Sequence, residues 1–267
     1  MILRGLPISL RRLPAIALDQ LLRPFRGIAQ SRPRVLSLVY FSCGRDFDIL
    51  QLSLRSIANL RLSTPPAGIH VVVDSKWPFS SGQQDALKAC VPSLYFHEGL
   101  GEIHDRSPVT ILTELRAFAT VAALVDPGSL IAKVDSDILF FSGRKLSRII
   151  SSRFDFVGDS SFVGGKFFQG GLYFMSADLA LRLNSRATLA DIPRVVQQVG
   201  CTAEDRVVSQ LVRRSARSVW DTQLMLFPDV YERIDLQSWW VRDEYCALHF
   251  FAQKGDMPRF AARISPE

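Results

Sequence analysis

Hydrophobic residues in the first half of the chain alternate between short continuous runs and longer stretches with helical spacing. The runs are rich in β-branched and aromatic residues and stop at polar or turn-forming residues, which predicts buried strands. The longer stretches repeat apolar residues every three or four positions, which predicts helices. The predicted strands are 35–42, 69–73, 94–97 and 130–134, and the predicted helices are 46–60, 80–90 and 110–125.

The second half has a looser pattern of shorter elements. The whole succession is typical of βαβ units, so we expect an α/β fold with a mixed, mainly parallel sheet and flanking helices. We expect an arm at 1–34 and one domain at 35–267, built from abutting halves at 35–142 and 143–267. The later predicted strands are 155–158, 167–168 and 172–175, and the later predicted helices are 177–184, 192–199 and 203–213.

Composition and charge exclude several classes of protein. With 48% hydrophobic and 22% charged residues, the 267-residue chain is ordinary for a globular protein, not collagen-like or disordered. Residues 1–34 account for the net charge of +6, because they contain seven arginines and only one acid, Asp19. The remaining residues hold equal numbers of basic and acidic side chains. A neutral body argues against a nucleic-acid-binding protein.

The basic arm contains apolar pieces but no run of the roughly 18–20 residues that a membrane-spanning helix needs. It also lacks the continuous apolar region and cleavage site of a secretory signal. A helix at 13–25, with arginines flanking an apolar stripe, would suit an anionic bilayer surface. The alternative is a disordered or core-packed extension. We therefore expect a cytoplasmic protein with peripheral membrane contact through residues 1–34.

The four cysteines are widely separated and form no C-x-x-C pair, which argues against zinc-knuckle and thioredoxin-type sites. Buried free thiols in a reducing compartment are the simplest interpretation. These cysteines are Cys43, Cys90, Cys201 and Cys246.

Two carboxylates, Asp135 and Asp137, follow directly after the predicted strand 130–134. They cannot both be buried as charges without a partner. A hard divalent cation such as Mg²⁺ or Mn²⁺ would supply one, because such ions bind carboxylate oxygens and substrate phosphates. An ordinary acidic turn is the alternative, but the place after a buried strand favours a metal or nucleotide site.

This strand and D-x-D pair resemble the GT-A class of nucleotide-sugar glycosyltransferases. The resemblance extends to Gln169-Gly170-Gly171-Leu172-Tyr173-Phe174-Met175-Ser176, which is similar to a G-G-x-Y-x-x-S stretch in several such families. It also includes the acidic pair in Thr202-Ala203-Glu204-Asp205 and the late histidine in Leu248-His249-Phe250. The order and spacing of these motifs agree with the class over about residues 35–255.

The resemblance implies that Asp137 and His249 bind Mn²⁺ or Mg²⁺ and that Asp135 contacts the metal or the ribose of the donor. It implies that an acid at a helix start takes the proton from an acceptor hydroxyl, with Asp205 preferred and Glu204 as the second candidate. Each residue also has a structural interpretation. Acids in a first helical turn complement the helix dipole, and a histidine among apolar neighbours can be an ordinary core residue.

Four further residues are implied in donor binding. Gly170 and Gly171 would form a wall of the sugar site, or only a tight turn. Asp74, which ends the second predicted strand, would bind the uracil edge of a UDP-sugar, or only form an Asx turn. Arg116 would reach a phosphate, or it would be a surface or salt-bridged arginine.

Lys254 would contact the diphosphate, as a lysine does in a glycogenin-like H-F-x-G-x-x-K-P-W pattern. The sequence departs from that pattern, because Ala252 replaces the glycine, the lysine comes one residue early and Pro-Trp is missing. Trp239 and Trp240, with Tyr245, are compatible with a platform for an acceptor sugar or with a packed core.

The function implied is transfer of a sugar from a nucleotide-diphosphate donor, a UDP-sugar, to an acceptor hydroxyl, with a glycan or lipid-linked acceptor. The acidic pair favours inversion and the glycogenin-like tail favours retention, so the stereochemistry is open. One alternative is a non-catalytic nucleotide- or glycan-binding protein of the same fold. Another is a nucleotidyltransferase, although residues 42–45 lack the Gly-rich basic loop typical of that class.

Overall fold

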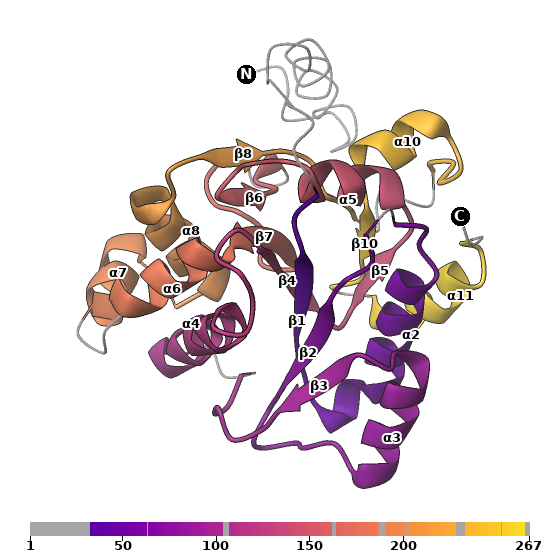
Figure 1. The fold of residues 1–267 in the computed structure, drawn as a ribbon, viewed down its shortest axis with the longest axis horizontal. Helices are drawn as coiled ribbons and strands as arrows, with labels where there is room; N and C mark the ends of the chain where they lie inside the picture. The colour runs from indigo at the N-terminus through magenta and orange to yellow at the C-terminus, as the bar shows by residue number, and fades with distance from the viewer. Residues whose placement is uncertain are drawn as a thin grey trace.

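A seven-stranded sheet forms the centre of the protein (Figure 1). The structure is a computed structural model, and it describes residues 33–62, 64–103, 107–161, 164–186, 191–200, 202–227, 233–251 and 253–264. The strand order is β3-β2-β1-β4-β7-β6-β8. The strands are β1 (Leu36–Ser42), β2 (Gly68–Val73), β3 (Leu94–His97), β4 (Leu130–Asp135), β6 (Phe156–Gly158), β7 (Leu172–Ser176) and β8 (Val219–Asp221).

Strands β1 to β4 are mutually parallel where they pair, β7 runs antiparallel to β4 and β6, and β6 is parallel to β8. The mixed, mainly parallel sheet expected from the sequence is therefore confirmed. Strands β1, β4 and β7 are buried along their whole length except for Asp135 at the end of β4. Burial on both faces explains their nearly continuous hydrophobic sequences.

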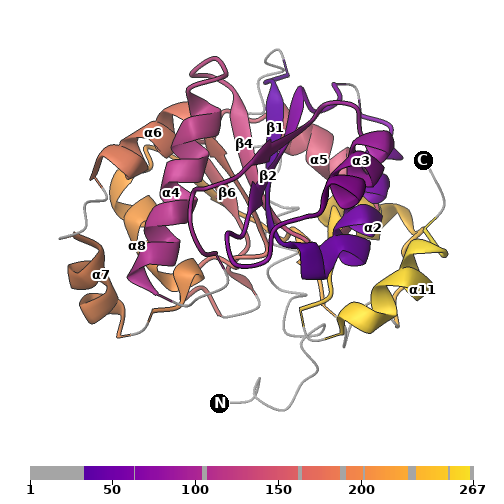
Figure 2. The same cartoon turned by 90° about the horizontal axis from the view of Figure 1, so that it is seen from below.

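Helices cover both faces of the sheet (Figure 2). One apolar cluster joins the sheet to α2, α3 and α5, and a second joins it to α4, α6, α7 and α8. Ser107 begins α4 by accepting a hydrogen bond from the Thr110 amide, with Pro108 in the first turn. The helices are α2 (Phe47–Ala58), α3 (Ser81–Cys90), α4 (Pro108–Ala122), α5 (Gly143–Ile150), α6 (Ala177–Arg186), α7 (Asp191–Val199) and α8 (Glu204–Ser215).

A small second sheet brings the late part of the chain to the end of β4. In it, β10 (Ala247–His249) lies between β5 (Ile138–Phe140) and β9 (Met225–Leu226). Strands β10 and β5 are antiparallel, and His249 pairs with Ile138. The remaining elements are η3 (Gly44–Asp46), α10 (Trp239–Glu244), η5 (Lys254–Asp256) and α11 (Met257–Ala261).

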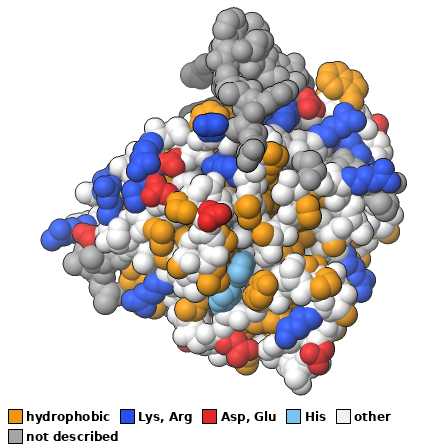
Figure 3. Space-filling view, in the orientation of Figure 1, with side chains coloured by type: hydrophobic (Ala, Val, Ile, Leu, Met, Phe, Trp, Pro, Cys, Tyr) orange, Lys and Arg blue, Asp and Glu red, His pale blue; other side chains and the backbone are white. Residues whose placement is uncertain are grey.

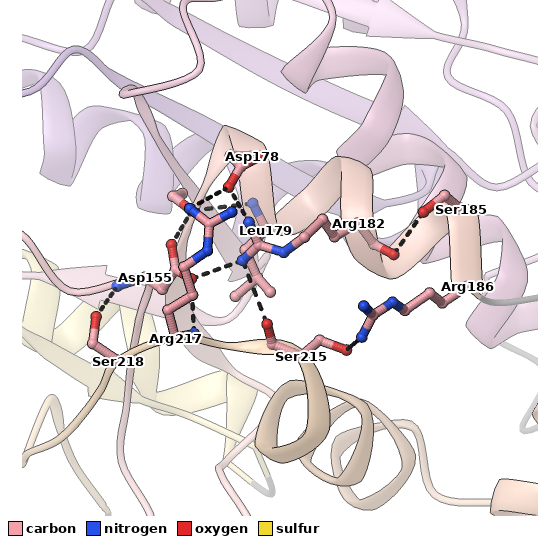
Figure 4. A network of polar contacts seen from close by, with 10 residues as sticks. Asp155, Asp178, Leu179, Arg182, Ser185, Arg186, Ser215, Arg217 and Ser218 are labelled. Atoms are coloured by element: carbon pink, nitrogen blue, oxygen red, sulfur yellow. Dashed lines mark hydrogen bonds and ion pairs between the residues drawn. The ribbon is translucent and has the colours of Figure 1, made fainter.

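A polar network joins the end of β7 to α6 and to Asp155, the residue just before β6 (Figure 4). Arg182 donates to Asp155 Oδ2 at 2.7 Å and also pairs with Asp178 one turn earlier in α6. Ser176 donates to Asp155 Oδ1 at 2.8 Å and accepts a bond from the Leu179 amide, so it caps α6. The network anchors the end of β7, the strand that follows the Gly170-Gly171 turn.

One expected strand is absent from the structure, and several other expected elements differ from it at their ends. Residues 167–168 form no strand, because Phe168 packs against Phe156 and its amide bonds to the Ser209 hydroxyl. The helix expected at 203–213 runs from Glu204 to Ser215.

The predicted helix at 13–25, nearly all of the arm, and Cys201 lie outside the described residues. Among the described cysteines, Cys43 and Cys246 are buried free thiols, and Cys90 is a half-buried one. No helix in the described part of the chain is long and apolar enough to cross a membrane.

Candidate metal and donor site

The candidate site lies where β1 and β4 end side by side. Strand order reverses between these two strands, because β1 leads to β2 and β3 on one side while β4 lies on the other. Open α/β sheets bind ligands at such a switch point, outside the carboxyl ends of the strands. Asp135 ends β4 opposite Phe41 of β1, and the Phe250 amide bonds to the Asp137 carbonyl at 3.0 Å. The fold thus joins the D-x-D pair to the C-terminal histidine.

Asp135, Asp137 and His249 form a group whose ligand atoms all lie within 4.8 Å of one another. The His249 Nε2 atom is 3.5 Å from Asp137 Oδ1. Asp137 and His249 are only 5% and 6% exposed, yet Asp137 Oδ1 and both ring nitrogens of His249 have no hydrogen-bond partner among the described residues. Buried polar atoms normally have a partner. A cation such as Mn²⁺, which accepts carboxylate and imidazole ligands, fits this donor set.

The two carboxylates differ in their electrostatic surroundings. Burial raises the pKa of Asp135, although Lys133 opposes the increase. Burial also acts to raise the pKa of Asp137, but His249 and the Lys254 charge outweigh it, so this pKa is lowered. Asp137 is therefore held as an anion, the form in which a carboxylate binds a cation.

Lys133 is the centre of a cluster of charged side chains that adjoins the metal-ligand group at Asp135. Its Nζ atom lies 2.8 Å from Asp135 Oδ1, 3.5 Å from Glu204 Oε2 and 3.9 Å from Glu114 Oε1. It also donates to the Gly170 carbonyl oxygen at 2.6 Å. Burial acts to lower the pKa of Lys133, but the three acids together raise it well above its usual value. One ammonium group therefore orients Asp135, Glu204 and the glycine turn together.

The Gly170-Gly171 turn lies against the site so closely that side chains would not fit. A Cβ atom at Gly170 would meet Glu204 Oε2 at 2.9 Å and Asp205 Cβ at 3.2 Å. A Cβ atom at Gly171 would lie 2.7–3.0 Å from the ring of His249. The structure thus places both glycines at the wall of the site, beside the acidic pair and the metal-ligand group.

Glu204 and Asp205 open α8 beside this wall. Tyr173 donates its hydroxyl to Glu204 Oε1 at 3.4 Å, so Glu204 is held between Lys133 and Tyr173. Asp205 accepts a bond from the amide of Arg206 at 2.8 Å. Burial and the neighbouring Glu204 charge raise the pKa of Asp205 to about 6. A carboxylate with a pKa this close to neutral can accept and release protons.

Lys254 lies near the metal-ligand group, since its charge interacts with Asp137 and Asp135. Its Nζ atom donates to Asp46 Oδ1 at 3.1 Å, and the Ser136 hydroxyl contacts Asp46 Oδ2 at 3.5 Å. Burial acts to lower the pKa of Lys254, but Asp46, Asp137 and Asp135 raise it. The ammonium group is therefore a fixed positive charge at the edge of the site.

Two other expected donor-binding residues lie directly after β2 and on α4. Asp74 is 1% exposed, and its carboxylate accepts bonds from the amides of Lys76 at 2.8 Å and Ile103 at 3.1 Å. It forms the Asx turn, and its carboxylate does not face an open surface. Arg116 is exposed on α4. Because side chains two positions apart on a helix point about 200° apart, Arg116 faces away from the buried Glu114.

Sequence reasoning missed Lys133, Glu114 and Asp46 as members of the site. Two of them carry a recognisable signal. Lys133 is a charge inside an apolar strand, and Glu114 lies on the apolar face of the helix that contains Ile111 and Leu115. A buried charge requires a counter-charge, so the sequence pattern is sufficient to suggest that these two residues pair. Asp46 carries no such signal, because it lies in a polar turn.

Several solved structures share this fold at low sequence identity, among them LgtC, WbbM and GlyE. LgtC, in an active-site mutant, is 12% identical, with 86% of this chain and 96% of that chain covered and a TM-score of 0.54. The bifunctional glycosyltransferase WbbM is 8% identical, with 88% and 50% covered and a TM-score of 0.53. The glycosyltransferase GlyE of Streptococcus pneumoniae TIGR4 is 9% identical, with 85% and 60% covered and a TM-score of 0.50.

The chain thus spans nearly all of LgtC but only about half of WbbM and 60% of GlyE. No protein-family model and no curated protein matches the sequence significantly. At sequence identities this low, the similarity to these structures concerns the fold. The fold implied by the sequence resemblance, that of the GT-A glycosyltransferases, is therefore confirmed.

Proposed function

We propose that this protein is a metal-dependent glycosyltransferase that moves a sugar from a nucleotide-diphosphate sugar, a UDP-sugar, to an acceptor hydroxyl. The observation that carries the proposal is the group of Asp135, Asp137 and His249 at the switch point of the sheet, in which buried atoms of Asp137 and His249 lack hydrogen-bond partners among the described residues. A GT-A fold alone would not define an activity. The ligand group adds a site with the chemistry of a divalent cation, Mn²⁺ or Mg²⁺.

A divalent cation bound by these three residues supplies electrostatic stabilisation of the departing diphosphate. Lys133 keeps Asp135 in position through its contact of 2.8 Å. Lys254 adds a point charge near the group and would contact the same diphosphate. The glycine turn lets the sugar approach closely, because no Cβ atom projects from Gly170 or Gly171.

Asp205 takes the proton from the acceptor hydroxyl, whose oxygen then bonds to the anomeric carbon of the sugar while the bond to the diphosphate oxygen breaks. Its raised pKa of about 6 suits this role. Glu204 holds the turn and Tyr173 in place and is the second candidate for the base. Direct attack assisted by Asp205 would invert the anomeric configuration.

The test is calorimetric titration of the protein with UDP, and with GDP for comparison, in Mn²⁺ and then in EDTA. The proposal expects UDP binding that requires the metal and is lost in Asp137→Asn. Asp85→Asn is a matched control, because Asp85 is exposed on α3, distant in sequence from the ligand group. If GDP binds in place of UDP with the same dependence on metal, the donor is a GDP-sugar. Absence of nucleotide binding in Mn²⁺ would refute the metal-dependent transferase.

A screen of UDP-sugars then separates an enzyme from a binding protein. A transferase releases UDP slowly even without an acceptor, since water can replace the acceptor hydroxyl, and it releases UDP faster when the acceptor is added. Release of pyrophosphate from a nucleoside triphosphate and a sugar phosphate would indicate a nucleotidyltransferase. Nucleotide binding with neither product would indicate a non-catalytic protein.

A further inference from the structure

An open cleft lined by arginines lies between the end of α2, the start of α5 and α10. Its volume is about 600 Å³, and its charged lining consists of Arg61, Arg144, Arg148, Arg242 and Asp243. Four positive charges against one negative charge leave an excess of three. The body of the protein is neutral as a whole, so this local excess is a distinct surface feature.

The cleft is separate from the candidate metal site. Strand β5 runs from Ile138 next to the metal ligands towards α5, which begins at Gly143. Five residues, 138–142, lie between Asp137 and Gly143, which corresponds to roughly 20 Å of extended chain. The arginines of the cleft therefore do not take part in the binding of a nucleotide at the metal-ligand group.

Two of the four arginines of the cleft have polar partners among the described residues. Arg148 pairs with Asp243 at 3.3 Å, and Arg242 donates to Gln237 Oε1 at 2.6 Å. Arg61 and Arg144 are exposed to solvent. Guanidinium groups bind phosphate oxygens through two parallel hydrogen bonds, so the chemistry of the cleft fits phosphate groups.

Two exposed tryptophans lie beside the cleft on α10. Trp239 is 67% exposed and Trp240 is 37% exposed, so neither is a core residue. Trp239 is three residues before Arg242 and four before Asp243, the spacing that places side chains on the same face of a helix. Figure 3 shows hydrophobic, basic and acidic side chains close together over α10, in the upper right of the view.

The combination favours a lipid surface over a free phosphate compound. Indole rings accumulate at the boundary between headgroups and acyl chains, and arginines bind the headgroup phosphates there. Arg34, the last residue of the basic arm, contacts α5, which also lines the cleft. Its amide donates a hydrogen bond to the Ile150 carbonyl at the end of that helix. A soluble phosphate ligand would explain the arginines but not the exposed tryptophans.

We propose that Arg61, Arg144, Trp239 and Trp240, with the cleft between them, form a bilayer-docking face for membranes that contain anionic phospholipids. The arginines contact headgroup phosphates, and Trp239 inserts at the interface. This inference does not rest on the proposed transferase reaction, since docking requires neither nucleotide nor metal.

The test is co-sedimentation of the full chain with phosphatidylcholine vesicles and with vesicles that also contain phosphatidylglycerol. We expect binding to the anionic vesicles that weakens with added salt. The double variant Arg61→Glu with Arg144→Glu changes the charge of the face by four units, so its partition coefficient should fall at least about tenfold. Trp239→Ala should weaken binding as well, by at least about threefold.

Matched controls separate this face from the basic arm, which remains in every variant. The double variant Arg194→Glu with Arg214→Glu makes the same charge change on α7 and α8, and Tyr95→Ala removes an exposed aromatic ring on β3. Both controls should bind more strongly than the matching face variants, and circular dichroism should show that all variants are folded. Equal binding by face and control variants, or no preference for anionic vesicles, would overturn the proposal.

Discussion

The ring of His249 lies directly against the backbone of Gly171, so close that a Cβ atom there would be 2.7 Å from Cε1. We therefore expect Gly171→Ala to push the imidazole away from Asp137 and to weaken Mn²⁺ binding at least about tenfold, a loss of about 1.4 kcal/mol. Titration calorimetry with Mn²⁺ would measure the change. Gly82→Ala is the control, because a Cβ atom at Gly82 meets nothing within 4 Å. Unchanged Mn²⁺ affinity in Gly171→Ala would exclude His249 as a metal ligand.

Lys133 neutralises buried carboxylates, so its removal should destabilise the fold. We expect Lys133→Met to lower the free energy of unfolding by about 3–5 kcal/mol, the range for a broken buried ion pair. Urea denaturation would measure it. Lys88→Met, at an exposed position of α3, should have little effect.

The loss in Lys133→Met should also depend on pH. Burial and the Glu204 charge already raise the pKa of Glu114 well above 4.5, and Lys133 opposes that increase. Without the lysine, folded Glu114 would retain its proton to a still higher pH than in the unfolded chain. An acid with a raised folded-state pKa loses stability as pH rises. The variant should therefore lose more stability at pH 8 than at pH 5, and an equal loss would contradict this account.

The sequence predicted the elements that depend on local pattern. The strand 130–134 and the helix 110–125 were predictable because apolar spacing and Asp126-Pro127-Gly128 mark them clearly. Residues 167–168 were wrongly predicted as a strand, since two adjacent aromatic residues resemble a strand fragment. In the structure, contacts with Ser209 and Phe156 determine their conformation instead.

The sequence predicted site residues only where they belong to a recognisable motif. Asp135 and Asp137 follow a buried strand, and the resemblance supplied His249, which the small sheet brings to Asp137. The pairing of Lys254 with Asp46 was not predictable, because 208 residues separate them and neither lies in a buried element. Long-range contacts between turns leave no periodic signal in the chain.

Lys254 should distinguish a diphosphate from a monophosphate. We expect Lys254→Gln to weaken UDP binding about tenfold in Mn²⁺, because a charge-assisted hydrogen bond contributes about 1.5–3 kcal/mol. UMP binding should change by less than about twofold, since UMP lacks the second phosphate. Calorimetry with both nucleotides measures this difference, and Lys88→Gln is the control. An equal loss for UDP and UMP would mean that Lys254 acts only through its pair with Asp46.

Asp205 should control the acid side of the pH–rate profile. Because the proposed base must be deprotonated and its pKa is about 6, the transfer rate should rise with pH through about 6 and then level off. Asp205→Asn should lower the rate at least about a hundredfold.

The same carboxyl group gives a stability signature that needs no substrate. Its folded-state pKa of about 6 exceeds its usual value of 3.8, so the folded protein holds this proton more tightly than the unfolded chain. Asp205 therefore contributes stability below pH 3.8, and this contribution is lost as pH rises from 3.8 to about 6. Asp205→Asn should remove that fall in the free energy of unfolding. If Asp205→Asn retains activity while Glu204→Gln loses it, Glu204 is the base, because only the true base must ionise for the acceptor hydroxyl to be deprotonated.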